Sequence, residues 1–197
     1  MHVILLPPKE GGSRRDSIDP SAAFVQTKGG VGIVVDFGMA QERVWDFDMG
    51  VARERPVIPR FPPHPPHFLI LTHGHVDHIG AALLLLQKYP NAQLVTTRPT
   101  LEICRIQWID LKKIARINGY PGLVPFSHDF FREIEKTAII VEEPGWTHLA
   151  GDVSVCFIPS GHGIRGSASV LIEADGKIVG LSGDVSVQDT PLVKGMR

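Results

Sequence analysis

Three histidines and one aspartate lie within six residues of this chain, in the segment His73-Gly74-His75-Val76-Asp77-His78. Imidazole nitrogens and carboxylate oxygens are the usual protein ligands of zinc and of similar divalent ions. The whole chain contains nine histidines, so three in one hexapeptide are hard to explain as an ordinary polar surface loop. The hexapeptide therefore predicts a metal site.

The hexapeptide lies between a predicted strand and a predicted helix. The preceding run Phe68–Leu71 is short and apolar, which is typical of a buried strand. Residues 79–89 predict a helix that ends before Pro90. Open α/β sheets place their sites at the carboxyl ends of strands. His73 and His75 should point to the same side of the extended segment, whereas Asp77 and His78 turn away as the helix begins. The hexapeptide therefore predicts two small, adjacent ligand sets, which suit two metal ions rather than one.

The rest of the chain predicts strands, then helices, then strands again. Residues Met39 to Arg55 are ambiguous, and a short helix is one interpretation. This order suits two sheets packed face to face with helices outside. The predicted strands are Val3–Leu6, Ala22–Thr27, Val31–Phe37, Gln93–Thr97, Ala138–Val141, Trp146–Leu149, Val153–Ile158, Ala168–Glu173 and Lys177–Leu181. The predicted helices are Leu101–Ile117, capped by Thr100, and His128–Lys136, capped by Ser127.

The composition is that of a globular protein, with 43% hydrophobic and 21% charged residues, and 197 residues predict a single domain. A chain that captures long nucleic acid by overall attraction is usually more basic than this one, whose formal net charge is -1, so such a partner must be held locally. Cys104 and Cys156 lack CxxC spacing and predict reduced thiols, which favours a cytoplasmic setting. No stretch is long and apolar enough to predict a membrane span.

Three further polar residues lie at or shortly beyond the ends of predicted strands, where the hexapeptide also lies. His162 lies in the glycine-rich loop 160–167, and Asp184 comes after Gly183 beyond the last predicted strand. Their shared position at strand ends is the reason to place them in one site, although a core or loop role is equally consistent with their spacing. Two roles are predicted for Asp36: it either orients a metal-binding histidine or forms a turn. His64, His67, His128 and His148 are predicted to be ordinary residues rather than ligands.

The hexapeptide, His162 and the Gly183-Asp184 pair together resemble the metallo-β-lactamase superfamily. The segments 161–168 and 182–186 are similar to its β-CASP branch, whose members cleave RNA or DNA. The resemblance covers nearly the whole chain and implies an α/β fold, a four-layer αββα sandwich. It implies two sets of metal ligands, with His73, His75 and His162 on one ion, Asp77 and His78 on a second, and Asp184 bridging both.

The same resemblance implies an activity, a cofactor and a partner. The cofactor would be two divalent metal ions, with zinc expected and manganese tolerated by the same ligands. The activity would be phosphodiester hydrolysis, with Asp77 and Asp184 as catalytic residues and RNA or single-stranded DNA as the substrate. Metal ions of this kind lower the pKa of bound water to roughly 7, which makes hydroxide available as the attacking group.

The chain departs from the family pattern after Asp184. The family completes the second metal site with a downstream histidine after an inserted domain, and this sequence contains neither. We therefore expect weak binding at the second site and an N-terminal piece of a longer protein, with a shortened relative as the alternative.

The sequence leaves two other functions and several details open. One alternative function is the hydrolysis of a small thioester, lactone or amide, and the other is a metal-binding fragment without activity. The sequence does not decide between cleavage within a strand and from its end. A homodimer is one assembly that it allows.

Overall fold

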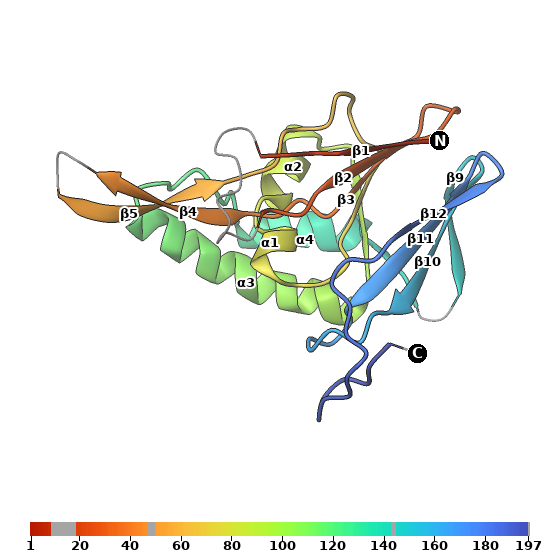
Figure 1. Cartoon of the computed structure of the whole chain (residues 1–197). Coiled ribbons are helices and arrows are strands. Elements are labelled where there is room, and N and C mark those ends of the chain that lie inside the picture. Colours follow the sequence, from red (N-terminus) through yellow and green to blue (C-terminus); the bar gives the residue numbers. More distant parts are fainter. Residues whose placement is uncertain (9–18, 47–49, 143–144, 197) are drawn as a thin grey trace.

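The structure is a computed structural model that describes residues 1–8, 19–46, 50–142 and 145–196. Figure 1 shows two β-sheets packed against each other, with the helices on the outer side of the larger sheet. A two-stranded hairpin extends away from this body, at the left of Figure 1.

The larger sheet has six strands in the order β1-β2-β3-β6-β7-β8. The pairs β1–β2 and β2–β3 are antiparallel. The pairs β3–β6, β6–β7 and β7–β8 are parallel. Because β3 and β6 are parallel neighbours, the residues after their carboxyl ends, Asp36 and Thr72, lie side by side. The bounds are β1 His2–Leu5, β2 Ala23–Gln26, β3 Gly32–Val35, β6 Phe68–Ile70, β7 Gln93–Thr96 and β8 Ile139–Ile140.

The smaller sheet has four antiparallel strands in the order β12-β11-β10-β9. The predicted turn at Asp175-Gly176 is confirmed, since Ala174 pairs with Lys177 across it. The Asp175 carboxylate lies 2.6 Å from the amino group of Met1, which ties this turn to the larger sheet. The bounds are β9 Trp146–Ala150, β10 Val153–Pro159, β11 Ala168–Ala174 and β12 Lys177–Leu181.

Alternating side chains of β3 enter two different cores. Val34 packs among the helices, whereas Ile33 and Val35 pack against the smaller sheet, where Val155 and Phe157 meet them. All of these side chains are at most 3% exposed. The predicted α/β fold of two face-to-face sheets with helices outside is confirmed, and in the described residues the helices cover the larger sheet (Figure 1).

In place of the single helix predicted at residues 79–89, the chain forms two shorter helices, and the first of them begins before residue 79. Their bounds are α1 Val76–Ile79 and α2 Ala82–Lys88, so Asp77 and His78 lie inside α1 rather than before a helix. Gly80 follows α1 and packs against Met39, where a Cβ at Gly80 would lie 2.4 Å from that of Met39. The Ala81 amide also leaves the helical pattern and donates to the Phe37 carbonyl, at 3.0 Å.

The longest helix, α3 Arg98–Ile117, begins earlier than predicted. Its N-cap is Thr97, whose side chain accepts a hydrogen bond from the Thr100 amide, so the prediction of Thr100 as the cap is wrong. Proline is tolerated in the first turn of a helix, and Pro99 therefore does not delay the start. Helix α4, His128–Thr137, has the predicted cap at Ser127. No helix in the described residues is both long and apolar enough to cross a membrane.

The interpretation of residues 39–55 as containing a helix is wrong. These residues belong to a hairpin of β4 Ala40–Asp46 and β5 Val51–Val57, paired in register from Ala40 and Val57 to Asp46 and Val51. The segment is rich in alanine, glutamate and arginine, which favour helices locally. Cross-strand pairing outweighs that preference here.

Candidate metal centre

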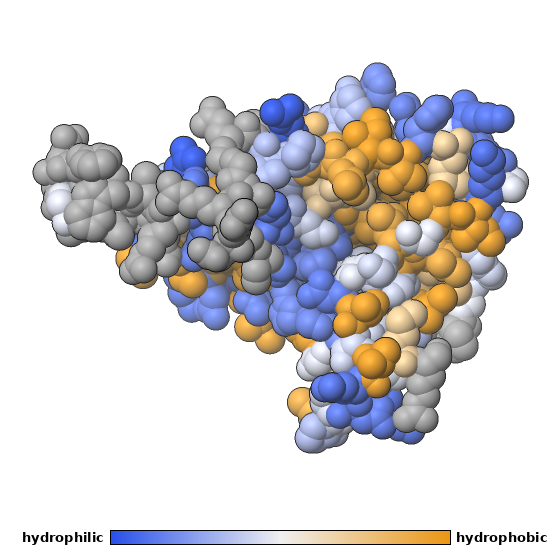
Figure 2. Space-filling view, viewed as in Figure 1, coloured by the Kyte–Doolittle hydropathy of each residue, from blue (hydrophilic) through white to orange (hydrophobic). Residues whose placement is uncertain are grey.

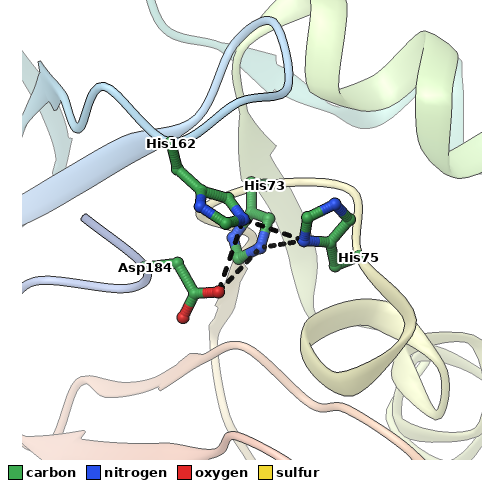
Figure 3. A group of neighbouring side chains, drawn as sticks. All are labelled: His73, His75, His162 and Asp184. Carbon is green, nitrogen blue, oxygen red and sulfur yellow. Dashed lines mark hydrogen bonds and ion pairs between the residues drawn. The ribbon is translucent and has the colours of Figure 1, made fainter. Parts of the chain in front are cut away.

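Four predicted ligands from distant parts of the chain point toward one another (Figure 3). We call His73, His75, His162 and Asp184 the first ligand set. The His75 Nδ1 atom lies 3.1 Å from His73 Nε2 and 3.0 Å from His162 Nε2. In a tetrahedral zinc site with Zn–N distances of about 2.0–2.1 Å, neighbouring donor atoms lie roughly 3.3 Å apart. The spacing of these nitrogens therefore fits a single metal ion of this kind.

Asp77, His78 and Asp184 form the second ligand set. The His78 Nε2 atom lies 3.3 Å from Asp184 Oδ1 and 3.7 Å from Asp77 Oδ2. The other oxygen of Asp184, Oδ2, lies 3.4 Å from His162 Nε2 in the first set. One carboxylate thus faces both sets, and within each set the ligand atoms lie within 4.8 Å of one another. The structure brings all six predicted site residues together.

Backbone contacts fix the hexapeptide against the segment after β3. The Phe37 amide donates to the His78 carbonyl at 2.8 Å, and the Met39 amide donates to the Val76 carbonyl at 2.9 Å. Gly38 lies between these bonds and directly against the Asp77 carbonyl, where a side chain would collide with the backbone. These contacts place Asp77 and His78 independently of their own side chains.

Asp36 is 2% exposed and contacts His78 of the second ligand set, as the first of its two predicted roles requires. Its Oδ2 atom lies 2.7 Å from His78 Nδ1 and 2.8 Å from the Thr72 hydroxyl. A carboxylate only accepts hydrogen bonds, so His78 Nδ1 donates and His78 Nε2 faces the second set. Asp36 has φ of 56°, in the left-handed region that aspartate tolerates better than most residues. Sequence reasoning did not single out Thr72, whose position next to the hexapeptide was the only local signal.

The environment of His73 and His75 favours their neutral imidazole forms. Burial, together with the charges of His78, His75 and His162, lowers the pKa of His73 to about 2. Burial and the charge of His162 also lower the pKa of His75. Neutral imidazole is the form that binds a metal ion. For His78, burial acts against protonation, but the hydrogen bond from its ring to Asp36 and the nearby carboxylates outweigh it and raise the pKa.

Acid is expected to destabilise the metal-free protein, starting below about pH 6.5, the ordinary pKa of histidine. In that range the unfolded chain binds a proton at His73, whereas the folded chain does not, because the pKa of His73 is lowered to about 2; the lowered pKa of His75 acts in the same direction. His73 alone should cost about 1.4 kcal/mol of unfolding free energy per pH unit in this range, and His75 should make the slope steeper. His78 does not oppose this slope below pH 6.5, since its raised pKa leaves it protonated in both states.

The measurement is urea unfolding of chelator-treated protein between pH 5 and 7.5. A His73→Gln variant should show a shallower slope than the wild type. An unfolding free energy that stays constant or rises as the pH falls would contradict the prediction.

The other histidines lie outside both ligand sets. His64, His128 and His148 are exposed, and His67 accepts a hydrogen bond at Nδ1 from the Gly32 amide, at 3.0 Å. These positions agree with their predicted ordinary roles.

A cavity of about 540 Å³ opens beside the second ligand set. Asp77, His78 and Asp184 form one part of its wall, and Leu5, Pro8 and Leu181 contribute apolar surface to the rest. Figure 2 shows apolar residues gathered on this face of the molecule, over β1 and β12. These are the edge strands of the two sheets, so the cavity lies where the sandwich is open at its edge.

Comparison with known sequences identifies one family and two named relatives. The sequence model of the metallo-beta-lactamase superfamily matches residues 18–191. A protein of Methanocaldococcus jannaschii named "Probable RNase MJ4" is 27% identical over 128 residues, which cover 64% of this chain and 29% of that protein. An "RNase J-like protein" of the same organism is 25% identical over 139 residues, which cover 71% of this chain and 30% of that protein. The chain thus spans less than a third of the length of these relatives.

Two solved structures share the fold at low sequence identity. A protein of unknown function from Enterococcus faecalis is 18% identical, with a TM-score of 0.56 over 94% of this chain and 44% of that one. An archaeal metallo-beta-lactamase superfamily protein from Sulfolobus tokodaii is 16% identical, with a TM-score of 0.51 over 90% of this chain and 67% of that one. At these identities the likeness concerns the fold alone.

Proposed function

The chain belongs to the metallo-beta-lactamase superfamily of metal-dependent hydrolases, and on this premise we propose that it is a phosphodiesterase of the β-CASP branch that cleaves RNA or single-stranded DNA. The observation that carries the proposal is the shared carboxylate of Asp184, whose two oxygens face two adjacent ligand sets. Two neighbouring metal ions are the arrangement that many nucleases use to stabilise the attacking and leaving oxygens of phosphoryl transfer. The names of both M. jannaschii relatives, which describe RNases, support the same substrate class.

The donor atoms suit zinc, and manganese would accept the same nitrogen and oxygen ligands. His73, His75, His162 and Asp184 would hold one ion, and Asp77, His78 and Asp184 would hold the other. The second set offers three donors, so we expect it to bind its ion more weakly than the first. When bound, the ions would activate water and neutralise charge that develops on the phosphoryl oxygens.

The side chains themselves have distinct tasks in this proposal. The Asp77 side chain is 27% exposed and lines the cavity, so its carboxylate can accept a hydrogen bond from water there and orient it. Asp184 holds the two ligand sets at a fixed separation. Asp36 keeps His78 directed at the second set by accepting a hydrogen bond from its other ring nitrogen.

The cavity favours one alternative, which is hydrolysis of a small thioester, lactone or amide. Its volume of about 540 Å³ is typical of small-molecule sites, which span roughly 300–1,000 Å³. Among the described residues that line it there is no lysine or arginine, and much of the wall is apolar. A neutral acyl substrate would fit such a wall without the cations that a phosphate group prefers.

The test uses the full chain, freed of metal with a chelator and reloaded with zinc or manganese. End-labelled single-stranded RNA, single-stranded DNA and a panel of thioesters, lactones and amides serve as substrates. We expect metal-dependent cleavage of RNA that an Asp77→Asn variant reduces, and the label pattern separates internal from terminal cleavage. Turnover of an acyl substrate without RNA cleavage would overturn the proposal in favour of the alternative. Metal binding without any hydrolysis would instead identify an inactive metal-binding domain.

A further inference from the structure

The Thr72 side chain lies at the junction of the two ligand sets and is fully buried. Its hydroxyl oxygen is 2.8 Å from Asp36 Oδ2 and 3.1 Å from His73 Nδ1. A Cβ atom at Gly183, the residue before Asp184, would lie 3.0 Å from the same hydroxyl oxygen. One side chain therefore touches the segments that supply His73, Asp36 and Asp184.

The directions of these hydrogen bonds are determined by the chemistry of the groups. A threonine hydroxyl has one hydrogen, and a carboxylate only accepts, so the Thr72 hydroxyl donates to Asp36. The hydroxyl oxygen can then only accept from His73, whose Nδ1 must carry the hydrogen. His73 Nε2 is left with its lone pair, and this is the atom that lies 3.1 Å from His75 Nδ1 in the first ligand set.

The same threonine also holds the carboxylate that orients the second set. The Thr72 amide donates to Asp36 Oδ1 at 2.9 Å, and its hydroxyl donates to Asp36 Oδ2. The carboxylate is thereby fixed in plane and position, and Oδ2 accepts from His78 Nδ1 at 2.7 Å. His78 Nε2 consequently faces Asp184 and Asp77.

We propose that the Thr72 hydroxyl is a positioning group shared by both ligand sets. It fixes the tautomer of His73 directly, and it helps to fix the orientation of His78 through Asp36. Its effect on metal affinity rests on the proposed metal-dependent function, whereas its effect on the His73 tautomer does not.

A matched pair of variants separates the hydroxyl from the rest of the side chain. Thr72→Ser keeps the hydroxyl and loses the methyl group, and Thr72→Ala loses both. The two variants therefore differ only in the hydroxyl, while any effect of the lost methyl group, which lies beside Gly183, is common to both. Thermal unfolding of each variant checks that it is folded before it is compared.

The first readout is the tautomer of each histidine ring in metal-free protein, from long-range proton–nitrogen correlations in NMR spectra. We expect His73 to carry its hydrogen on Nδ1 in the wild type and in Thr72→Ser. In Thr72→Ala the Nε2–H form should appear at His73, whereas His78 keeps its Nδ1–H because Asp36 remains. A wild-type His73 with its hydrogen on Nε2, or a tautomer unchanged in Thr72→Ala, would overturn the proposal; the wild-type result alone decides if the alanine variant does not fold.

The second readout is zinc affinity, measured by competition with a chromophoric chelator. Loss of a hydrogen bond to a metal-binding histidine typically weakens metal binding by about 10–100-fold, and we expect this for Thr72→Ala against Thr72→Ser. Equal affinities of the two variants would refute the shared positioning role. If zinc binding and tautomers agree with these expectations but RNA is not cleaved, the proposed function fails and the role of Thr72 stands.

Discussion

Replacement of Asp184 by asparagine is expected to lower the rate of the proposed RNA cleavage about a thousand-fold, equivalent to about 4 kcal/mol of transition-state stabilisation. The carboxylate places Oδ2 at 3.4 Å from His162 in one ligand set and Oδ1 at 3.3 Å from His78 in the other. Asparagine keeps the shape but turns one of these oxygens into an NH₂ donor, which repels a metal ion and removes the negative charge. The measurement is kcat/KM on labelled RNA together with the zinc content of each chain, which should fall below the wild-type value.

The matched control for this variant is Asp129→Asn. Asp129 lies on helix α4 with a side chain that is 91% exposed, outside both ligand sets. The same chemical change there should leave the rate and the zinc content at wild-type values. An Asp184→Asn protein that keeps the wild-type zinc content and a near-normal rate would show that this carboxylate does not bridge the site.

Replacement of Gly38 by alanine is expected to destabilise the fold by more than about 4 kcal/mol, beyond the effect of most single substitutions. A Cβ atom at this position would lie 1.6 Å from the Asp77 carbonyl oxygen and 2.9 Å from the His78 amide nitrogen. These are backbone atoms of α1, which also accepts a hydrogen bond from the Met39 amide, so neither segment can retreat without breaking the contacts around the hexapeptide. The measurement is the unfolding free energy from urea titration, with zinc affinity as a second readout of the displaced Asp77.

Gly122→Ala supplies the control for the general effect of a glycine-to-alanine change. A Cβ atom at Gly122 would meet no atom within 4 Å, and its backbone does not require the left-handed region. Its unfolding free energy should stay within about 1 kcal/mol of the wild type. A Gly38→Ala protein as stable as this control would contradict the close packing of the segment after β3 against α1.

Some features of the fold and of the site were predictable because their cause is local in the sequence. His73, His75, Asp77 and His78 are neighbours along the chain, and the apolar run before them forms β6 as predicted. The Ser127 cap and the turn at Asp175-Gly176 are also local signals, and both are confirmed. Local preference was misleading for β4 and β5, because strand pairing between residues 40–46 and 51–57 overrides the helical propensity of the segment.

Sequence alone thus predicted the candidate donor atoms, the strand before them and the class of metal chemistry that such donors allow. Only the tertiary structure decided that His162, 87 residues from His75, comes within 3.0 Å of it, and that Asp184 faces both ligand sets. It also placed the Asp36 carboxylate against His78 and revealed Thr72, because β3 and β6 are parallel neighbours whose carboxyl ends meet. The physical reason is that side-chain type and spacing record short-range preferences, whereas sheet order and hydrogen-bond partners depend on which strands pair over long distances.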